Sequence, residues 1–196
     1  MAAVSSTRVL SAGLRGTWVR DLALVVGGTL FIAVSAQISI PLPFSPVPLT
    51  GQTFAVLLTG AVLGSGLGLA STALYLAAAL AGLPVLSPTE TGTHLTGTAV
   101  LSMPTLGYVI GFMLASLAVG TLAERGYSRT PLRTVLAMVV GNVIIYSLGL
   151  LWLQHALAAS WSDTIAWGLT PFLIGDALKV ALAAGLLPAA WSFVRN

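Results

Sequence analysis

The sequence predicts an all-α, polytopic membrane protein whose six transmembrane helices form a single integral membrane domain over residues 1–196. Two properties of the composition support this fold class: 57% of the residues are hydrophobic, and the mean hydropathy is +0.98. A soluble core built from 196 residues cannot hide that much apolar surface, so the chain is expected to lie in lipid. At about 20 residues for each crossing, plus short loops, the length accommodates six helices.

The charge and the cysteine content exclude several classes of function. Only 7% of the residues are charged, and the eight basic residues are spread over the chain, so they form no patch for nucleic acid. The absence of cysteine excludes disulfides, thiolate nucleophiles and thiolate metal sites. Glu90 and His94 are four residues apart, but their segment ETGTH is typical of a loop and contains no third ligand. We therefore expect no metal site and no cofactor.

The N-terminal part of the chain combines a polar arm, a first span and a proline-rich stop. Residues 1–21 lack the apolar run of a signal peptide and are interpreted as a cytoplasmic arm. The first span is expected at about 22–40, because about 19 residues give a helix of about 28 Å, which matches the hydrocarbon thickness. Proline-rich PLPFSPVPL (41–49) then ends the helix, and we expect it to be extended and to lie against protein or water.

Two short spans are expected next, at about 50–63 and 67–83, with a hinge at the GSG sequence of residues 64–66. A single helix over 50–83 would be about 51 Å long, which is more than moderate tilt absorbs. The alternative stays open, because such a helix would place Gly60, Gly64 and Gly68 on one close-packing face.

After a polar loop at 84–103, the remaining spans are expected at about 104–123, 134–153 and 165–194, with Pro171 interrupting the start of the last. Six spans place both termini on one side of the membrane. The basic residues that fall on that side are Arg8, Arg15, Arg20, Arg125, Arg129, Arg133 and Arg195. By the positive-inside rule, both termini are predicted to be cytoplasmic.

The last span contains two opposite charges, Asp176 and Lys179, within PFLIGDALKVALAAG. A charge near the bilayer centre costs about 2.5–3.5 kcal/mol, so such residues face the bundle interior and find partners. Because they are three residues apart, both side chains project from one helix face. They form either an ion pair that only joins helices or a ligand site for a small solute with N–H and carbonyl or carboxylate groups.

Other candidate ligand-binding residues are polar or aromatic and lie in or beside the spans: Gln52, Thr53, Tyr75, Ser87, Tyr108, Asn142 and Tyr146. Gln52 and Thr53 follow the proline-rich segment and either line an outer mouth or cap a helix. The three tyrosines either stack on a ligand ring or belong to the core or interface. Asn142 and Ser87 would supply hydrogen bonds, with Ser87 in the loop expected to cover the site.

Four segments follow one another along the chain: SAQISIPLPFSPVPLTGQTFAVLLTGAVLG, LYLAAALAGLPVL, PTLGYVIGF and PFLIGDALKVALAA. In order and spacing, they resemble the BioY family of biotin-binding S components of energy-coupling-factor (ECF) transporters. The resemblance runs from about Leu22 to Leu187. In PTLGY, Leu106 stands where the family usually has glycine, which is a departure beside the expected ligand site.

The resemblance implies a subunit of the bacterial-type inner or plasma membrane that captures biotin from outside. It also implies partners, namely a transmembrane coupling protein and two cytoplasmic ATPases. Only these partners would use ATP, because the chain has no phosphate-binding loop. Asp176 and Lys179 match the family's ligand-contacting acid and base. We assign Asp176 to ureido N–H groups and Lys179 to the ureido carbonyl, with the biotin carboxylate at Lys179 as the alternative.

The first span carries small residues four apart, Ala23 with Gly27 and Thr29 with Ala33, which suit close helix packing. The resemblance points to this helix as the docking face for the coupling protein. An S component for thiamin or riboflavin is an alternative function, and an intramembrane enzyme is a second. An enzyme is disfavoured, because Asp176 is the only acidic residue expected within a span and both histidines fall in loops.

Overall fold

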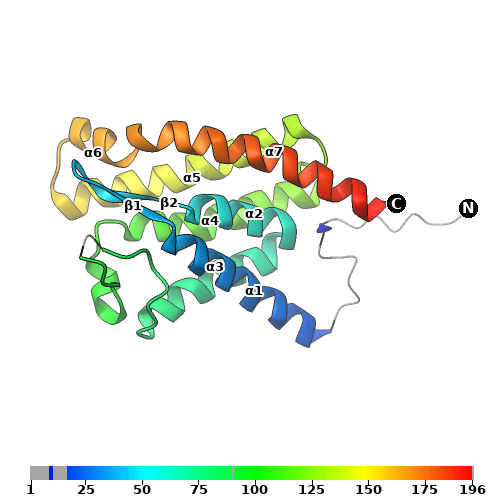
Figure 1. The fold of residues 1–196 in the computed structure, drawn as a ribbon, viewed down its shortest axis with the longest axis horizontal. Helices are drawn as coiled ribbons and strands as arrows, with labels where there is room; N and C mark the ends of the chain where they lie inside the picture. The colour runs from blue at the N-terminus through cyan, green and yellow to red at the C-terminus, as the bar shows by residue number, and fades with distance from the viewer. Residues whose placement is uncertain (1–8, 11–16, 90, 196) are drawn as a thin grey trace, which may run out of the picture.

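A computed structural model describes residues 9–10, 17–89 and 91–195 of the chain. Figure 1 shows a bundle of helices with a small hairpin and a long loop at one end. The elements, in chain order, are α1 (Trp18–Gln37), β1 (Ser39–Leu42), β2 (Ser45–Thr50), α2 (Gln52–Leu63), α3 (Ser65–Leu80), η2 (Gly97–Ser102), α4 (Leu106–Glu124), α5 (Pro131–Leu157), α6 (Trp161–Gly168), η3 (Thr170–Phe172) and α7 (Leu173–Arg195). The short elements η2 and η3 are 3-10 helices.

The helices carry the apolar sequence that lipid requires. Within the described residues, the segments long and apolar enough to cross a membrane are Trp18–Gln37, Leu106–Glu124, Pro131–Leu157 and Trp161–Phe193. α2 and α3 are apolar but shorter. The structure therefore confirms a mostly helical bundle of membrane-protein character, whereas the count of six spans stays a prediction.

α1 begins earlier than the predicted span at 22–40. The hydroxyl of Thr17 accepts a hydrogen bond from the backbone N–H of Arg20 at 3.3 Å, and this contact caps the first turn. Residues 18–21 therefore belong to the helix and not to the predicted arm at 1–21. Nearly all the rest of that arm lies outside the described residues.

The all-α prediction is wrong at the proline-rich segment, which forms the antiparallel hairpin β1–β2. Ser39 pairs with Thr50, and Leu42 pairs with Ser45. The predicted extended conformation is confirmed, because proline fixes φ near the extended range and cannot continue a helix. The hydroxyl of Ser45 donates to the backbone O of Trp167 at 2.8 Å, so the hairpin is held against α6.

The hinge between the second and third predicted spans is confirmed, and the single long helix is excluded. α2 ends before Gly64, whose φ of +88° lies in the left-handed region that favours glycine. The carboxylate of Glu124 in α4 accepts hydrogen bonds from both the backbone N–H and the hydroxyl of Ser65, each at 2.8 Å. Gly60 and Gly68 still approach each other, but across the junction of two helices.

The last predicted span, at 165–194, is divided into α6, η3 and α7. Pro171 lies in η3, as the predicted interruption requires, because proline has no N–H to donate. α7 consequently starts at Leu173, and Asp176 lies in its first turn. Free N–H groups and the helix dipole favour a carboxylate at this position.

The bundle has two chemically different ends. At one end, Trp191 near the end of α7 donates a hydrogen bond to Ser128 in the α4–α5 loop at 2.9 Å, and Glu124 binds the α2–α3 junction. At the other end, Figure 1 shows the hairpin, α6 and the α3–α4 loop (residues 81–105). The candidate site lies at this second end.

Candidate ligand-binding site

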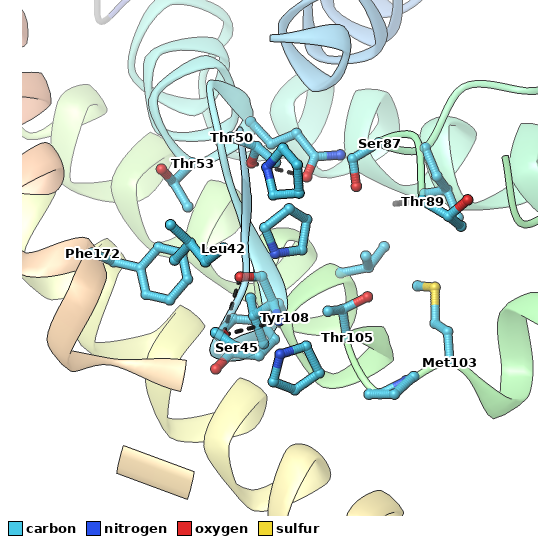
Figure 2. A pocket seen from close by; sticks show the side chains of 18 of the residues that line it. Leu42, Ser45, Thr50, Thr53, Ser87, Thr89, Met103, Thr105, Tyr108 and Phe172 are labelled. Atoms are coloured by element: carbon cyan, nitrogen blue, oxygen red, sulfur yellow. Dashed lines mark hydrogen bonds between the residues drawn. The ribbon is translucent and has the colours of Figure 1, made fainter. Parts of the chain in front are cut away.

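A cavity of about 410 Å³ lies between the hairpin, the α3–α4 loop, η3 and the facing ends of α2, α4, α5 and α7. This volume falls within the range of about 300–1,000 Å³ that is usual for small-molecule sites. Figure 2 shows Thr50, Thr53 and Ser87 along one side of the cavity, with Ser45 and Tyr108 on the opposite side. Seven of the nine predicted ligand-binding residues line it: Gln52, Thr53, Ser87, Tyr108, Tyr146, Asp176 and Lys179.

Asp176 and Lys179 form an ion pair in the cavity wall. The Lys179 Nζ atom lies 2.9 Å from Asp176 Oδ1, as the spacing of three residues predicts. Asp176 is 5% exposed, and the Lys179 side chain is 21% exposed. The acid is thus almost enclosed by protein, while the base keeps part of its surface toward the cavity.

Two further side chains complete the surroundings of the pair. The Thr53 hydroxyl accepts from Lys179 Nζ at 2.8 Å and donates to Asp176 Oδ1 at 3.4 Å. The Tyr146 hydroxyl donates to Asp176 Oδ2. Buried charges need such hydrogen bonds, because their mutual attraction alone does not offset the loss of hydration. The sequence placed these four residues in three separate spans, and the structure brings them together.

The pair retains hydrogen-bonding capacity for a ligand. A carboxylate accepts about four hydrogen bonds and an ammonium donates three. Within the described residues, Asp176 receives bonds from Lys179, Thr53 and Tyr146, and Lys179 donates to Asp176 and Thr53. One acceptor position, on Asp176 Oδ2, and one donor N–H of Lys179 therefore remain within the same ion pair. They fit a ligand group with an N–H next to a carbonyl, such as an amide or a urea.

Gln52 and Tyr75 form a second polar group at the cavity, but only Gln52 lines it. The Gln52 Nε2 atom donates to the Tyr75 hydroxyl, which in turn donates to the backbone O of Val85 at 3.1 Å. Tyr75 is 1% exposed and lies behind Gln52. The structure therefore does not place the Tyr75 ring where it would stack on a ligand.

Tyr108 does line the cavity, and its ring meets that of Tyr146 edge-on, with 6.4 Å between ring centroids. The Tyr108 hydroxyl donates to the backbone O of Gly168 at 2.9 Å, which holds α4 against the end of α6. Asn142 does not line the main cavity. It faces a much smaller space beside Asp176 and Lys179, where its Oδ1 atom is buried without a hydrogen-bond partner among the described residues.

Sequence reasoning missed several residues of the cavity wall, which come from the hairpin and the loops: Leu42, Ser45, Val47, Thr89, Thr91, Thr105 and Phe172. One signal for the hairpin residues was present, since a proline-rich segment between spans must lie against protein or water. The loop residues carry no periodic pattern that would indicate them.

The predicted docking residues of α1 do not share one exposed face. Thr29 and Ala33 are buried inside the bundle, and the Thr29 hydroxyl donates to the backbone O of Ser71 at 2.9 Å. Ala23 and Gly27 are exposed. Thr29 and Ala33 are therefore wrong as docking residues, because a partner cannot reach them without opening the bundle, whereas docking at Ala23 and Gly27 stays a prediction.

The residues considered for a metal site lie in the α3–α4 loop. Glu90 lies outside the described residues, and His94 Nδ1 is 2.8 Å from the backbone O of Leu86. Across the described ranges, no group of three or more His, Asp or Glu side chains is arranged to hold a metal ion.

Comparison with known proteins decides the family. The BioY family model matches residues 5–196. This chain belongs to the BioY family. Among the BioY relatives, a protein named biotin transporter BioY from Thermotoga maritima is 38% identical over 80% of this chain and 86% of its own length. A protein named probable biotin transporter BioY from Lysinibacillus sphaericus is 35% identical, over 85% of this chain and 84% of the relative.

A solved structure shares the fold of this bundle. The crystal structure of the S-component for biotin from an ECF-type ABC transporter superposes with a TM-score of 0.76 at 24% identity, covering 89% of this chain and 92% of the other. Leu106, which stands where BioY proteins usually have glycine, does not line the cavity. Leu106 is buried at the start of α4, while its neighbours Thr105 and Tyr108 line the cavity.

Proposed function

We propose that this chain is the membrane-embedded biotin-binding S component of an ECF-type transporter and serves biotin uptake. The observation that carries this proposal is membership of the BioY family over residues 5–196, with relatives named as biotin transporters. The chain acts as a transport subunit and not as an enzyme. ATP is used by partner subunits, and no cofactor is bound.

The chemistry of the cavity supports biotin as the ligand. Biotin carries a cyclic urea at one end and a carboxylate at the other, joined by apolar carbon and sulfur atoms. The free acceptor position on Asp176 takes one ureido N–H, and the free N–H of Lys179 donates to the ureido carbonyl. This arrangement keeps the pair close to neutral with and without ligand, which is favourable at a buried position.

The proposed topology follows from the two ends of the bundle. Arg125 and Arg129 in the α4–α5 loop, and Arg133 in the first turn of α5, lie at the end opposite the cavity. The positive-inside rule makes that end cytoplasmic, so six crossings leave both termini inside and the cavity open to the outside. Arg8 and Arg15, which support the same orientation, lie outside the described residues.

The proposed partners are a transmembrane coupling protein and two cytoplasmic ATPases, in a bacterial-type inner or plasma membrane. The exposed small residues of α1, Ala23 and Gly27, are the proposed point of contact with the coupling protein. This part of the proposal rests on the ECF-type transporter to which the similar crystal structure belongs.

Equilibrium binding of labelled biotin to the purified chain tests the proposal. The measurement is made in detergent, with no nucleotide and no other protein present. We expect saturable binding of one biotin per chain that unlabelled biotin displaces and that thiamin and riboflavin do not. An absence of binding, or displacement by thiamin or riboflavin, would contradict the assignment to biotin.

A further inference from the structure

The ion pair alone does not satisfy a cyclic urea. The two N–H bonds of such a ring flank the carbonyl and point away from each other, so a single carboxylate cannot accept both. The Asp176 carboxylate also has only one accepting position left once Lys179, Thr53 and Tyr146 are counted. If biotin binds as proposed, its second ureido N–H needs another acceptor in the cavity wall.

The Gln52 side chain provides an acceptor at a suitable place. Gln52 lines the cavity, and the next residue along α2 is Thr53, which contacts both members of the ion pair. An amide, however, presents either an oxygen that accepts or an NH₂ that donates, and the two ends have the same shape. The function of Gln52 therefore depends on which end faces the ligand.

The hydrogen bonds of Tyr75 determine that orientation. The backbone O of Val85 can only accept, so the single hydroxyl proton of Tyr75 points toward Val85. The Tyr75 oxygen is then left to accept, and Gln52 must offer it the NH₂ group. The Gln52 Oε1 atom consequently turns the other way, where it accepts a bond from the Thr50 hydroxyl at 3.3 Å. Thr50 and Gln52 both line the cavity, so the bond between them places this oxygen at the cavity wall.

We infer that Gln52 Oε1 accepts the second ureido N–H of biotin and that Tyr75 is the positioning residue that holds the amide in this orientation. The inference rests on the proposed function, since it names the contact for the same ligand in the same cavity. Gln52 is 6% exposed and Tyr75 is 1% exposed, so water has little access to either group. Reversing the amide would place Gln52 Oε1 against the Tyr75 oxygen, whose proton is given to Val85, and would leave buried groups unsatisfied.

The test uses two cyclic carbamate analogues of biotin, each with a ring oxygen in place of one ureido N–H. The replacement turns a donor into an acceptor at one known position. Dissociation constants for biotin and both carbamates are measured on the wild-type chain, on Tyr75→Phe and on Gln52→Met. In the wild type, we expect each carbamate to bind at least about ten-fold more weakly than biotin, as expected for one lost buried hydrogen bond.

One carbamate carries its ring oxygen in place of the N–H that faces Gln52. In both variants, we expect the Kd of this carbamate divided by the Kd of biotin to fall by about ten-fold. In Gln52→Met the acceptor is absent, and in Tyr75→Phe the amide can turn its NH₂ toward the ring oxygen. The ratio for the other carbamate, whose changed atom faces Asp176, stays at its wild-type value. A residue with only a structural role would change all three affinities in parallel and leave both ratios unaltered.

Tyr127→Phe is the matched control, because Tyr127 lies in the α4–α5 loop at the far end of the bundle. It should leave every Kd unchanged. Ratios that stay within about two-fold of wild type in Gln52→Met overturn the inference, whether or not Tyr75→Phe folds. A change in Gln52→Met without a change in folded Tyr75→Phe overturns the role of Tyr75. If the wild type binds no biotin, the proposed function itself fails.

Discussion

At the scale of single residues, Asp176 combines two favourable environments. It lies in the first turn of α7, where the helix dipole favours a negative charge, and it is bound by Lys179, Thr53 and Tyr146. These contacts explain how an almost fully buried carboxylate is tolerated in an apolar bundle. They also orient the carboxylate, because donors on both of its oxygens leave it little freedom to rotate.

Replacing Asp176 with asparagine tests its proposed contact with the ureido ring. The variant keeps the shape but loses the negative charge, and it leaves Lys179 without a counter-ion. We expect biotin and desthiobiotin to bind about ten- to a hundred-fold more weakly, and by the same factor, because both contain the ureido ring. The measurement is the equilibrium Kd of each ligand for the purified variant.

Asp163→Asn provides the control for this substitution. Asp163 is an exposed residue in the first turn of α6 and accepts from Ser160, away from the cavity. Its variant should bind both ligands as the wild type does. Unchanged affinity of Asp176→Asn for both ligands would remove the carboxylate from the ureido contact. Stronger binding would favour the alternative in which Lys179 meets the biotin carboxylate.

At the scale of elements, close contact between α4 and α5 depends on glycine. A Cβ atom on Gly107 would collide with the backbone O of Leu148 and with Trp152, and one on Gly111 would lie 3.0 Å from the Cα of Ile145. These contacts involve backbone atoms, which cannot move aside as a flexible side chain does. The two helices carry Tyr108 and Tyr146, so their spacing also sets the width of the cavity.

Gly107→Ala should therefore destabilise the bundle. We expect a loss of about 1–3 kcal/mol, the usual cost of forcing extra atoms into a packed contact. Gly66→Ala is the matched control, because a Cβ there meets no atom within 4 Å, and it should leave stability unchanged or slightly increased. Thermal unfolding in detergent measures both. A Gly107→Ala protein as stable as Gly66→Ala would contradict this close packing.

The positions of the breaks between elements could be predicted from the sequence, because glycine and proline act locally. Gly64 ends α2, Pro171 separates α6 from α7, and the proline-rich segment is extended. That this segment forms a hairpin could not be predicted, since pairing depends on contacts with α6 that are distant in sequence. The same limit applies to the cavity wall contributed by the α3–α4 loop.

The faces of helices were predicted less well than their existence. Asp176 and Lys179 were placed correctly because a spacing of three fixes their relative direction. Gly27 and Thr29 point about 200° apart at 3.6 residues per turn, so they cannot share a docking face, and the spacing alone was sufficient to show this. Tyr75 differs, since only the packed structure reveals that Gln52 separates it from the cavity.

At the scale of the whole molecule, the orientation in the membrane can be tested with single cysteines, because the chain contains none. Thr91 in the α3–α4 loop and Thr130 in the α4–α5 loop are both exposed, at opposite ends of the bundle. We expect a membrane-impermeant maleimide to label Thr91→Cys in intact cells, and Thr130→Cys only after permeabilisation. The opposite pattern would reverse the proposed topology.

Assembly with the coupling protein is expected to depend on the exposed face of α1. A side chain at Gly27 meets no atom of this chain within 4 Å, so Gly27→Leu changes only what a partner would contact. We expect this variant to lose co-purification with the coupling protein and to keep wild-type biotin affinity. Gly185→Leu, equally open but on α7, should assemble normally. Normal assembly of Gly27→Leu would remove this face from the interface.

The cavity and the opposite end of the bundle differ in what holds them together. Opposite the cavity, Glu124 joins α4 to α3, and Trp191 joins α7 to the α4–α5 loop. Around the cavity, the wall consists largely of a hairpin and a loop, fastened by single bonds such as that from Ser45 to α6. We therefore expect exchange of the vitamin with the medium to depend on the hairpin and the loop, while the helix contacts stay intact. The time for which the vitamin stays bound would accordingly depend on the mobility of the hairpin and the loop, and not on the stability of the helix bundle.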